Sequence, residues 1–214
     1  MTRSLSEAES KRVLAQLGVP VVEERLVTTV DAAVDAGDEL GYPVVVKACA
    51  PGLSHKTEHG LVRLGLGDAQ ALRTAAEGVL DAARALGPAD LLVAPMVRGS
   101  RELIAGMHVD EQFGPCVMLG LGGVAAEALA DVTFRLVPLS EADAQEMPDD
   151  LRSRALLDEF RGEPAVDRAA LTRVLLALSA LAEQDAAVVA ADVNPLVVVD
   201  GLPVAVDALV EVRE

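Results

Sequence analysis

Residues 43–66 read PVVVKACAPGLSHKTEHGLVRLGL. The apolar run from Pro43 to Lys47 predicts a short buried strand, and residues 61–66 predict a second strand. Residues 50–60 carry Pro, two Gly and little periodicity, which indicates a loop between the two strands. The stretch therefore predicts a strand pair whose first strand ends in a lysine.

Helices and further strands are expected on both sides of this pair. A capping pattern at Ser6 predicts a helix from residue 7 to about residue 17. The other segments are a strand at 19–27, an Ala-rich helix at 30–40 ended by Gly41, a helix at 68–86 and a strand at 91–94 that runs into Pro95-Met96. Helices that alternate with strands in this way predict a sheet covered by helices.

The remaining half of the chain predicts a second lobe. Strands are expected at 102–109 and 115–121 with a turn between them, through 133–137, and in the apolar runs 188–193, 196–199 and 204–210. Helices are expected after Gly122-Gly123, after Ser140, and from Asp167 to about Glu183. We find no long linker, and we place the lobe boundary so that residues 1–95 form the N-terminal lobe and residues 96–214 the C-terminal lobe.

The composition narrows the class of protein. Of 214 residues, 51% are hydrophobic but only 2% are aromatic, so the core is expected to consist of Val, Leu and Ala, as in an α/β or α+β enzyme domain. A net charge of −16 argues against nucleic acid or an anionic membrane as partner. Two cysteines without CxxC spacing, a charged N-terminal stretch and no long apolar run predict a cytoplasmic protein without a membrane span.

The lysines point to an anion site. The chain has three, and two of them, Lys47 and Lys56, lie close together with His55 and His59. An ammonium at the end of an apolar strand needs a phosphate or carboxylate partner, unless Lys47 reaches the surface from an edge strand. A neutral imidazole can accept a phosphoryl group, although a histidine in a polar loop is more often merely exposed.

Two further patterns suit phosphate and metal binding. Residues 120–123 read GLGG between a strand and a helix, where backbone amides favour anions, although a tight turn explains the glycines equally well. Asp192, Asn194 and Asp207 interrupt apolar strands, where polar oxygens need compensation. Magnesium is one such compensation; turn caps and a surface charge are the alternative.

Taken in order, these segments resemble a known family. The motifs are LSEAESKRVLAQLGVPV (5–21), GYPVVVK (41–47), SHKTEHG (54–60), RELIAGMHVDEQFGPCVMLGLGG (101–123), FRLVPLS (134–140), DVNPLVV (192–198) and AVDAL (205–209). Over nearly the whole chain they resemble the ATP-grasp subunit or domain of the ADP-forming (more generally NDP-forming) acetyl-CoA synthetases, relatives of the succinyl-CoA synthetase beta subunit. The resemblance implies an α+β ATP-grasp fold with two lobes and the nucleotide site between them.

The resemblance also implies roles for individual residues. Lys47 and Lys56 would bind the nucleotide phosphates, and Gly122 and Gly123 would belong to the phosphate loop. The hinge residues Ala94, Met96 and Val97 would contact adenine, and Glu102 would line the nucleotide pocket. Asn194 and Asp207 would bind Mg²⁺, and His55 would be a transient phosphohistidine. The implied ligands are ATP or ADP with Mg²⁺. One departure is visible at His59-Gly60-Leu61, where the family usually has an acidic or small residue followed by Gly-Gly, and this difference could stiffen the loop and slow transfer.

The implied activity is that of an acid-thiol ligase that forms ADP. It would work only with a CoA-binding alpha-type subunit or domain, so the active form is expected to be a hetero-oligomer. Two alternatives remain open from the sequence: a regulatory ATP-grasp module of a larger acetyltransferase-fused protein, and a different ATP-grasp carboxylate ligase that does not require CoA.

Overall fold

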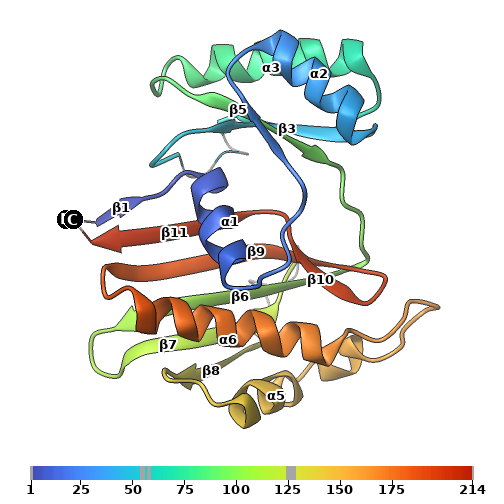
Figure 1. Ribbon diagram of the computed structural model, residues 1–214. Coiled ribbons are helices and arrows are strands. Elements are labelled where there is room, and N and C mark those ends of the chain that lie inside the picture. The colour runs from blue at the N-terminus through green and yellow to red at the C-terminus, as the bar shows by residue number, and fades with distance from the viewer. Residues whose placement is uncertain (1, 54–55, 57–58, 124–128, 214) are drawn as a thin grey trace. The chain divides into compact units, whose positions relative to one another are not determined.

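The computed structural model describes residues 2–53, 56, 59–123 and 129–213 (Figure 1). The chain divides into two compact units. The first unit contains Met1–Arg3, Glu9–Val21 and Arg98–Glu214, and the second contains Ser4–Ala8 and Val22–Val97. Each unit combines helices with an antiparallel sheet, which confirms the predicted α+β class.

The second unit is built on a four-stranded antiparallel sheet with the strand order β2-β5-β3-β4. Helices α2 and α3 both lie on one face of this sheet (Figure 1). The elements are β2 Arg25–Val27, α2 Val30–Leu40, β3 Val44–Cys49, β4 Val62–Leu66, α3 Ala69–Ala83 and β5 Asp90–Pro95. The side chain of Thr29 caps α2 and that of Asp68 caps α3, and Gly41, at φ 83°, ends α2 as predicted.

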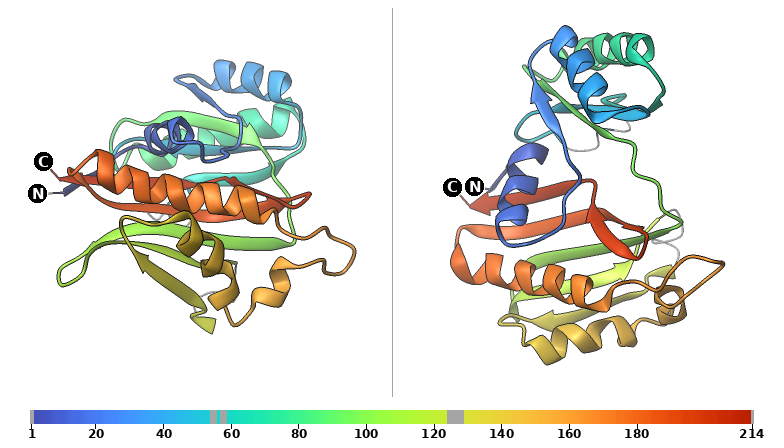
Figure 2. Two further views of the ribbon diagram at one scale, coloured as in Figure 1. Left: turned by 60° about the horizontal axis from the view of Figure 1, so that its bottom comes forward. Right: turned by 45° about the vertical axis from the view of Figure 1, so that its right-hand side comes forward.

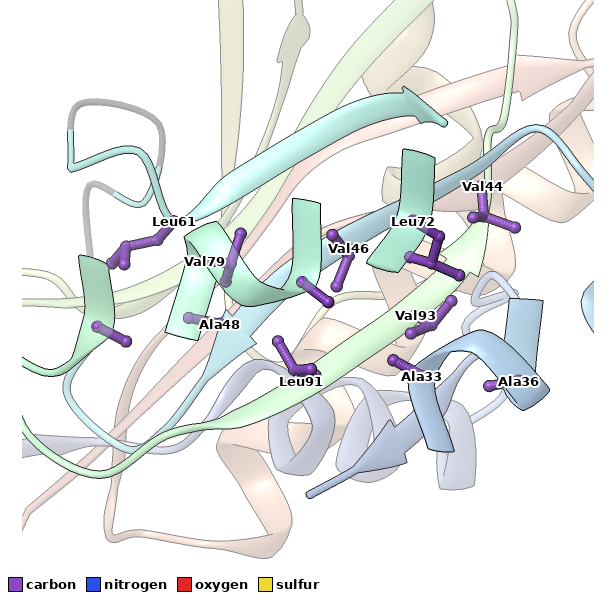
Figure 3. Close-up of a cluster of buried hydrophobic side chains, with 12 residues drawn as sticks. Ala33, Ala36, Val44, Val46, Ala48, Leu61, Leu72, Val79, Leu91 and Val93 are labelled. Carbon is purple, nitrogen blue, oxygen red and sulfur yellow. The ribbon is translucent and has the colours of Figure 1, made fainter. Parts of the chain in front are cut away.

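The core of the second unit lies between this sheet and its two helices. Figure 3 shows Val46, Leu91 and Val93 of the sheet pointing toward Leu72 and Val79 of α3. The small residues of α2 also belong to this cluster, which lets that helix approach the sheet closely. All six residues of β3 are buried, and the charged Lys47 is one of them.

The first unit is built on a seven-stranded sheet with the order β1-β11-β9-β6-β7-β8, in which β10 also pairs with β9. Its strands are β1 Thr2–Ser4, β6 Arg101–Asp110, β7 Gly114–Leu121, β8 Val132–Leu136, β9 Val188–Val199, β10 Leu202–Ala205 and β11 Ala208–Arg213. Its helices are α5 Glu141–Asp150, a 3-10 turn Arg154–Leu157 and α6 Arg168–Gln184. Helix α1 (Glu7–Gln16) contributes Glu7 and Ala8 to the second unit and its other residues to the first.

Helices α5 and α6 pack on one face of the seven-stranded sheet (Figure 2). Ser140 opens α5 with a capping box that includes Asp143, and the side chain of Asp167 caps α6. Buried residues of α6 include Leu171, Leu175 and Leu178, which turn its apolar side to the sheet. In the part of the chain that the structure describes, every helix is too short or too polar to cross a membrane.

The two apolar runs predicted at 188–193 and 196–199 are a single strand, β9, so this prediction was wrong. A proline has no N–H to donate to a ladder, so Pro195 would interrupt a regular strand. On β6, Leu103 pairs with Leu196 and Ala105 with Val193, so Ile104 alone faces both Asn194 and Pro195. This two-against-one arrangement is a β-bulge, which accommodates the proline without ending the strand.

Two other strand predictions were also corrected. The strand predicted at 19–27 is reduced to β2, and Val21 makes only an isolated bridge to Ala205. Between Val21 and the start of β2 the chain passes from the first unit into the second. For this reason residues 19–27 do not pair with one neighbouring strand along their whole length. The run predicted at 204–210 is divided between β10 and β11.

The predicted lobes and the compact units differ at three places. Residues 1–3 and 9–21 belong to the first unit, together with residues 98–214, whereas the sequence assigned all of residues 1–95 to one lobe. Residues 96–97 belong to the second unit, whereas the sequence assigned them to the other lobe. The assignment of 1–95 and 96–214 as ATP-grasp lobes stays a prediction. The helix predicted after Gly123 falls mainly on residues 124–128, which lie outside the described part of the chain.

Gly37 of α2 tests the close packing of the second unit. A Cβ at this position would lie 2.4 Å from Cδ2 of Leu72 and 2.9 Å from the hydroxyl of Tyr42. We expect Gly37→Ala to lower the free energy of unfolding by about 1–3 kcal/mol, because overpacking outweighs the helix propensity gained. Gly78→Ala in α3 is the matched control, since a Cβ there meets no atom within 4 Å. It should raise stability by about 0.5–1 kcal/mol in the same urea titration followed by circular dichroism. Equal stabilisation of both variants would contradict the packing.

Candidate functional site

Lys47 is a buried charge with a carboxylate partner. The residue is only 8% exposed, and its Nζ donates a hydrogen bond to Oε1 of Glu7 at 2.6 Å. This pairing satisfies the ammonium inside the second unit, so the alternative that Lys47 reaches the surface is wrong. The sequence predicted a phosphate or a carboxylate beside Lys47, and in the structure the carboxylate of Glu7 lies there.

Glu7 binds a second lysine with its other oxygen. Nζ of Lys56 donates to Oε2 of Glu7, and the Glu7 side chain has no exposed surface. The next residue, Ala8, packs against Cys49 and Leu92 and so holds the start of α1 against the sheet. We call Glu7, Lys47 and Lys56 the two-lysine cluster. In this cluster each ammonium group donates to a different oxygen of the same buried carboxylate.

Cys49 lies near this cluster at the end of β3. Burial raises the pKa of its thiol above the usual value, although a backbone hydrogen bond with Ala8 lowers it in part, and the neighbouring Glu7 carboxylate raises it further. The thiol therefore stays protonated at neutral pH. Since the thiolate is the reactive form, we assign Cys49 a packing role rather than a chemical one.

The base of the 50–60 loop is held by backbone hydrogen bonds. The N–H of Ala48 donates to the carbonyl of Leu61 at 2.9 Å, and the N–H of Leu61 donates to the carbonyl of Lys56 at 2.8 Å. His55, the predicted phosphohistidine, lies outside the described residues. Its role therefore stays a prediction, but its chain neighbour Lys56 belongs to the two-lysine cluster.

The predicted hinge residues end the second unit. Ala94 is a buried residue of β5 and pairs with Val45 of β3. The N–H of Met96 donates to the carbonyl of Pro43 at 2.9 Å, and Val97 is the last residue of the unit. Because the Met96 N–H already has a partner, an adenine base at this segment would need other backbone groups.

Glu102, Gly122 and Gly123 are brought together in the first unit. The N–H of Gly122 donates to the Glu102 carbonyl at 2.7 Å, and a Cβ on Gly122 would lie 3.0 Å from the Glu102 backbone. Gly123 has φ 80° and lies beside the Glu102 side chain, whose Oε2 would be 3.5 Å from an added Cβ. The close approach and the positive φ explain why both positions are glycine.

Asn194 and Asp207 are also brought together, at the β-bulge of β9. The N–H of Asn194 donates to the Asp207 carbonyl at 3.3 Å, and the N–H of Val206 donates to the Pro195 carbonyl at 3.2 Å. At this point β9 changes partner, since it pairs with β11 up to Val193 and with β10 from Leu196. Bulges commonly direct side chains at functional sites, and this one places the two predicted metal ligands next to each other.

The oxygen ligands at the bulge fit a magnesium ion. Asp192 presents accessible surface, yet loss of surrounding water raises the pKa of its carboxyl, and repulsion from the nearby Asp207 carboxylate raises it further. A divalent cation would relieve this repulsion. Among the described residues, no group of three or more His, Cys, Asp or Glu could hold a metal. Magnesium generally takes one or two protein oxygens and completes its shell with water and phosphate.

Glu102 and Asp192 lie on one face of the seven-stranded sheet. Asp192 lies opposite Gly106 of β6, and residues that pair across a ladder point to the same face. Successive side chains of a strand point to opposite faces, and Glu102 is separated from Gly106 by an even number of positions on β6, so it lies on that face as well. A hollow of about 660 Å³ is lined by Gly106 and Asp192 together with apolar residues that include Met118, Phe134 and Leu136. Glu102, Gly122, Gly123, Asn194 and Asp207 do not line this hollow.

Glu7 is the residue that the sequence analysis missed. It lies inside the capping pattern that begins at Ser6, in which the answering glutamate is Glu9, and the pattern gives Glu7 no role of its own. Its partners are 40 and 49 residues away in the chain, and a local sequence pattern does not show contacts between residues so far apart. The only available signal was the requirement for an anion beside Lys47.

Comparisons with known proteins give the class of the chain. The ATP-grasp domain family matches residues 1–212. The beta subunit of ADP-forming acetate–CoA ligase II of Pyrococcus furiosus is 38% identical, over 84% of this chain and 78% of that subunit. A second relative is a solved structure, the dinucleotide forming acetyl-coenzyme A synthetase 1 of Ca. Korarchaeum cryptofilum in complex with coenzyme A, Ca-AMPCP and HgCl⁺. Its TM-score is 0.91 at 34% identity, and the match covers 99% of this chain and 94% of that chain.

Another structure of the Korarchaeum enzyme is bound to coenzyme A and Mg-AMPPCP, with its phosphohistidine segment pointing towards the nucleotide binding site. Its TM-score is 0.84 at 34% identity, with coverage of 98% of this chain and 93% of that chain. The fold of this chain is thus the ATP-grasp fold. The chain belongs to the family of the beta subunits of the ADP-forming acyl-CoA synthetases. The predicted family, fold and ligase class are confirmed, and these relatives give no support to the regulatory alternative.

Asp207→Asn tests the metal ligands. The amide keeps the shape of the side chain but removes its charge, so we expect the affinity for ADP in the presence of Mg²⁺ to fall about 10-fold or more. Asp200→Asn is the matched control, because Asp200 lies in the β9–β10 turn at φ 49°, a conformation that asparagine tolerates. Its affinity should stay within about 2-fold of the wild type. The measurement is isothermal titration calorimetry with and without Mg²⁺, and equal losses in both variants would contradict the assignment.

Proposed function

We propose that this chain is the nucleotide-binding subunit of an ADP-forming acyl-CoA synthetase and that it passes a phosphoryl group between an acyl phosphate and the nucleotide through His55. The observation that carries the proposal is the two-lysine cluster, in which the ammonium groups of Lys47 and Lys56 meet at one carboxylate and Lys56 is the chain neighbour of His55. A phosphoryl group on His55 would be next in the chain to the Lys56 ammonium. The Korarchaeum relative, with its phosphohistidine segment and Mg-AMPPCP, supports the same chemistry.

The proposed transfer has three steps. On the CoA-binding partner, a histidine nitrogen attacks the phosphorus of the acyl phosphate, so that a P–N bond forms, the P–O bond to the acyl group breaks and the carboxylate leaves. A neutral imidazole nitrogen of His55 then attacks that phosphorus, so that a new P–N bond forms, the P–N bond to the partner histidine breaks and the partner histidine becomes neutral again. A terminal oxygen of ADP then attacks the same phosphorus, so that the P–N bond breaks, ATP forms and His55 becomes neutral again. The reverse direction uses ATP to make the acyl phosphate from which acyl-CoA is formed.

The chain's own residues would mainly position and neutralise charge, which phosphoryl transfer generally requires. Lys47 would contact the nucleotide phosphates, the backbone around Gly122 and Gly123 would bind phosphate oxygens, and residues 94–97 would bind adenine. Asn194 and Asp207 would hold magnesium. When bound, magnesium supplies further neutralisation of the phosphate charges.

The partner would be a CoA-binding alpha-type subunit. The Pyrococcus relative is named as a beta subunit, which implies an alpha subunit, and the Korarchaeum structure contains coenzyme A. We therefore infer that the active form is a hetero-oligomer. The net charge of −16 and the free cysteines Cys49 and Cys116 favour a cytoplasmic protein that binds neither nucleic acid nor an anionic membrane.

His55→Ala tests the relay. The chain is mixed with its alpha-type partner, Mg²⁺ and γ-labelled ATP, and the acid-labile label on the protein is measured. We expect label on the wild-type chain and none on the His55→Ala chain, because the alanine offers no nitrogen to phosphorylate. His59→Ala, in the same loop, is the matched control and should keep its label. Mg-ATP binding without any labelled histidine in the wild type would contradict the proposal and favour a regulatory module.

A further inference from the structure

Strand β8, at one edge of the seven-stranded sheet, turns its apolar side chains away from α5 and α6 (Figure 1). Val132, Phe134 and Leu136 lie on the face opposite these helices, which we call the open face, and are 40%, 55% and 56% exposed. The residues between them point toward α5: Thr133 is 7% exposed, and Arg135 forms an ion pair with the last residue of that helix. A sheet with one solvated face normally has the opposite alternation, with its apolar residues under the helices. The open face of β8 thus has the composition of a surface that another molecule covers.

The register of the sheet fixes this arrangement. Phe134 pairs with Met118 of β7, and Met118 pairs with Gly106 of β6, so the three residues share the open face. Thr133 pairs with Leu119, which has no exposed surface. Pairing is regular along all of β8, and a slip by one residue would exchange its two faces. The exposure of Phe134 is therefore a property of the whole strand and not of one side chain.

The exposed side chains of β8 form one wall of the hollow on this face. The hollow has a volume of about 660 Å³, and Met118, Phe134 and Leu136 are among its lining residues. Phe113 in the β6–β7 turn also lines it and is 70% exposed. The chain has three phenylalanines, one tyrosine and no tryptophan, so half of its aromatic residues lie at this hollow. Exposed aromatic and aliphatic side chains that gather around a hollow are typical of a protein interaction surface.

We infer that the alpha-type partner docks at this hollow with a segment that presents large apolar side chains next to lysine or arginine. We call the docking site, formed by Phe113, Met118, Phe134 and Leu136, the β8 surface. The inference rests on the proposed function, because that function requires a partner chain, and it adds the place on this chain where the partner binds.

The charges around the β8 surface define the chemistry of the partner. Asp110 and Asp192 line the hollow, and Glu111 lies in the same exposed turn as Phe113. The backbone N–H groups of Phe113 and Gln112 donate to the Asp110 carboxylate and lower its pKa, so this carboxylate is ionised at neutral pH. A lysine or arginine on the partner would compensate these carboxylates while its apolar neighbours fill the hollow.

A second copy of this chain fits the β8 surface poorly. In a two-fold contact the same patch meets itself, so Asp110 and Asp192 would face their own copies. Arg135, which also lines the hollow, is already paired with α5. Each copy carries a net charge of −16, and like charges across an interface are unfavourable. The charges therefore favour a different chain as the occupant.

The β8 surface adjoins the predicted metal site without including it. Asp192 lines the hollow, and Asn194 lies two residues further along β9. Among the described residues, those proposed to bind nucleotide or metal do not line the hollow. A partner at the β8 surface is therefore held beside this site, and weaker docking should leave nucleotide binding intact.

Phe134→Thr and Leu136→Thr test the docking site in the full chain. Threonine keeps the preference for a β-strand but removes the large apolar side chain. The dissociation constant of the complex with the alpha-type partner is measured by calorimetry, and we expect it to rise about 10- to 100-fold in each variant, with Mg-ADP binding unchanged. Leu202→Thr is the matched control, because Leu202 is a 49% exposed residue of β10 in the same unit. Its partner affinity should stay within about 2-fold of the wild type.

Glu111→Lys tests the charge of the partner segment. A lysine in the exposed turn would repel a basic partner, so we expect association to slow about 3- to 10-fold at low salt and the difference to shrink at high salt. Glu77→Lys, at an exposed position of α3, is the charge-matched control and should associate at the wild-type rate. Unchanged or faster association of Glu111→Lys would overturn the inference.

The labelling of His55 separates docking from chemistry. With limiting partner, Phe134→Thr should gain label more slowly than the wild type, and saturating partner should restore the wild-type rate. Wild-type partner affinity in both folded threonine variants, or slow labelling that saturating partner does not restore, overturns the inference. So does self-association of the free chain through Phe134 with unchanged partner affinity, because the surface is then a contact between copies.

The remaining outcomes are also decisive. If Phe134→Thr does not fold, Leu136→Thr decides by the same criteria. A wild-type chain that binds its partner but gains no label overturns the proposed function alone, and the partner affinities of the variants still decide the inference. A labelled wild type whose threonine variants keep full partner affinity overturns only the inference.

Discussion

A buried ammonium requires an anion beside it, and this constraint organises the second unit. Lys47 lies in a strand whose six residues are all buried, so its charge cannot be left to solvent. The anion is the carboxylate of Glu7 at the start of α1, and the same carboxylate accepts a hydrogen bond from Lys56 in the 50–60 loop. Three segments that are far apart in the sequence are thereby fixed at one point by two hydrogen bonds.

A different constraint organises the first unit, namely the pairing of β9 with its neighbouring strands. This strand pairs with β6 along one edge and with β11 and then β10 along the other. The bulge at Asn194 and Pro195 coincides with the change from β11 to β10, where Asp207 lies in the chain. The predicted metal ligands Asn194 and Asp207 thus lie where the regular ladder is interrupted.

The sequence predicted those features that local chemistry determines. The helix at 30–40 was predicted correctly because Thr29 and Gly41 mark its ends, and the strand of Lys47 because its apolar run is continuous. It could not show that β9 is one strand, since a bulge depends on the register of the neighbouring strand. Residue type alone suggested Asn194 and Asp207 as ligands. The role of Glu7 was hidden, because nothing in a local pattern shows which distant lysines a glutamate will meet.

The scarcity of lysines affects how assemblies of this chain can be mapped. Only three are present, Lys11 is 1% exposed, and the side chains of Lys47 and Lys56 are nearly as inaccessible. Amine-reactive cross-linkers need accessible primary amines, so they will find few attachment points among these side chains. The 34 aspartates and glutamates offer many more. Carboxyl-directed reagents are therefore the better choice for locating neighbouring subunits on the surface of this chain.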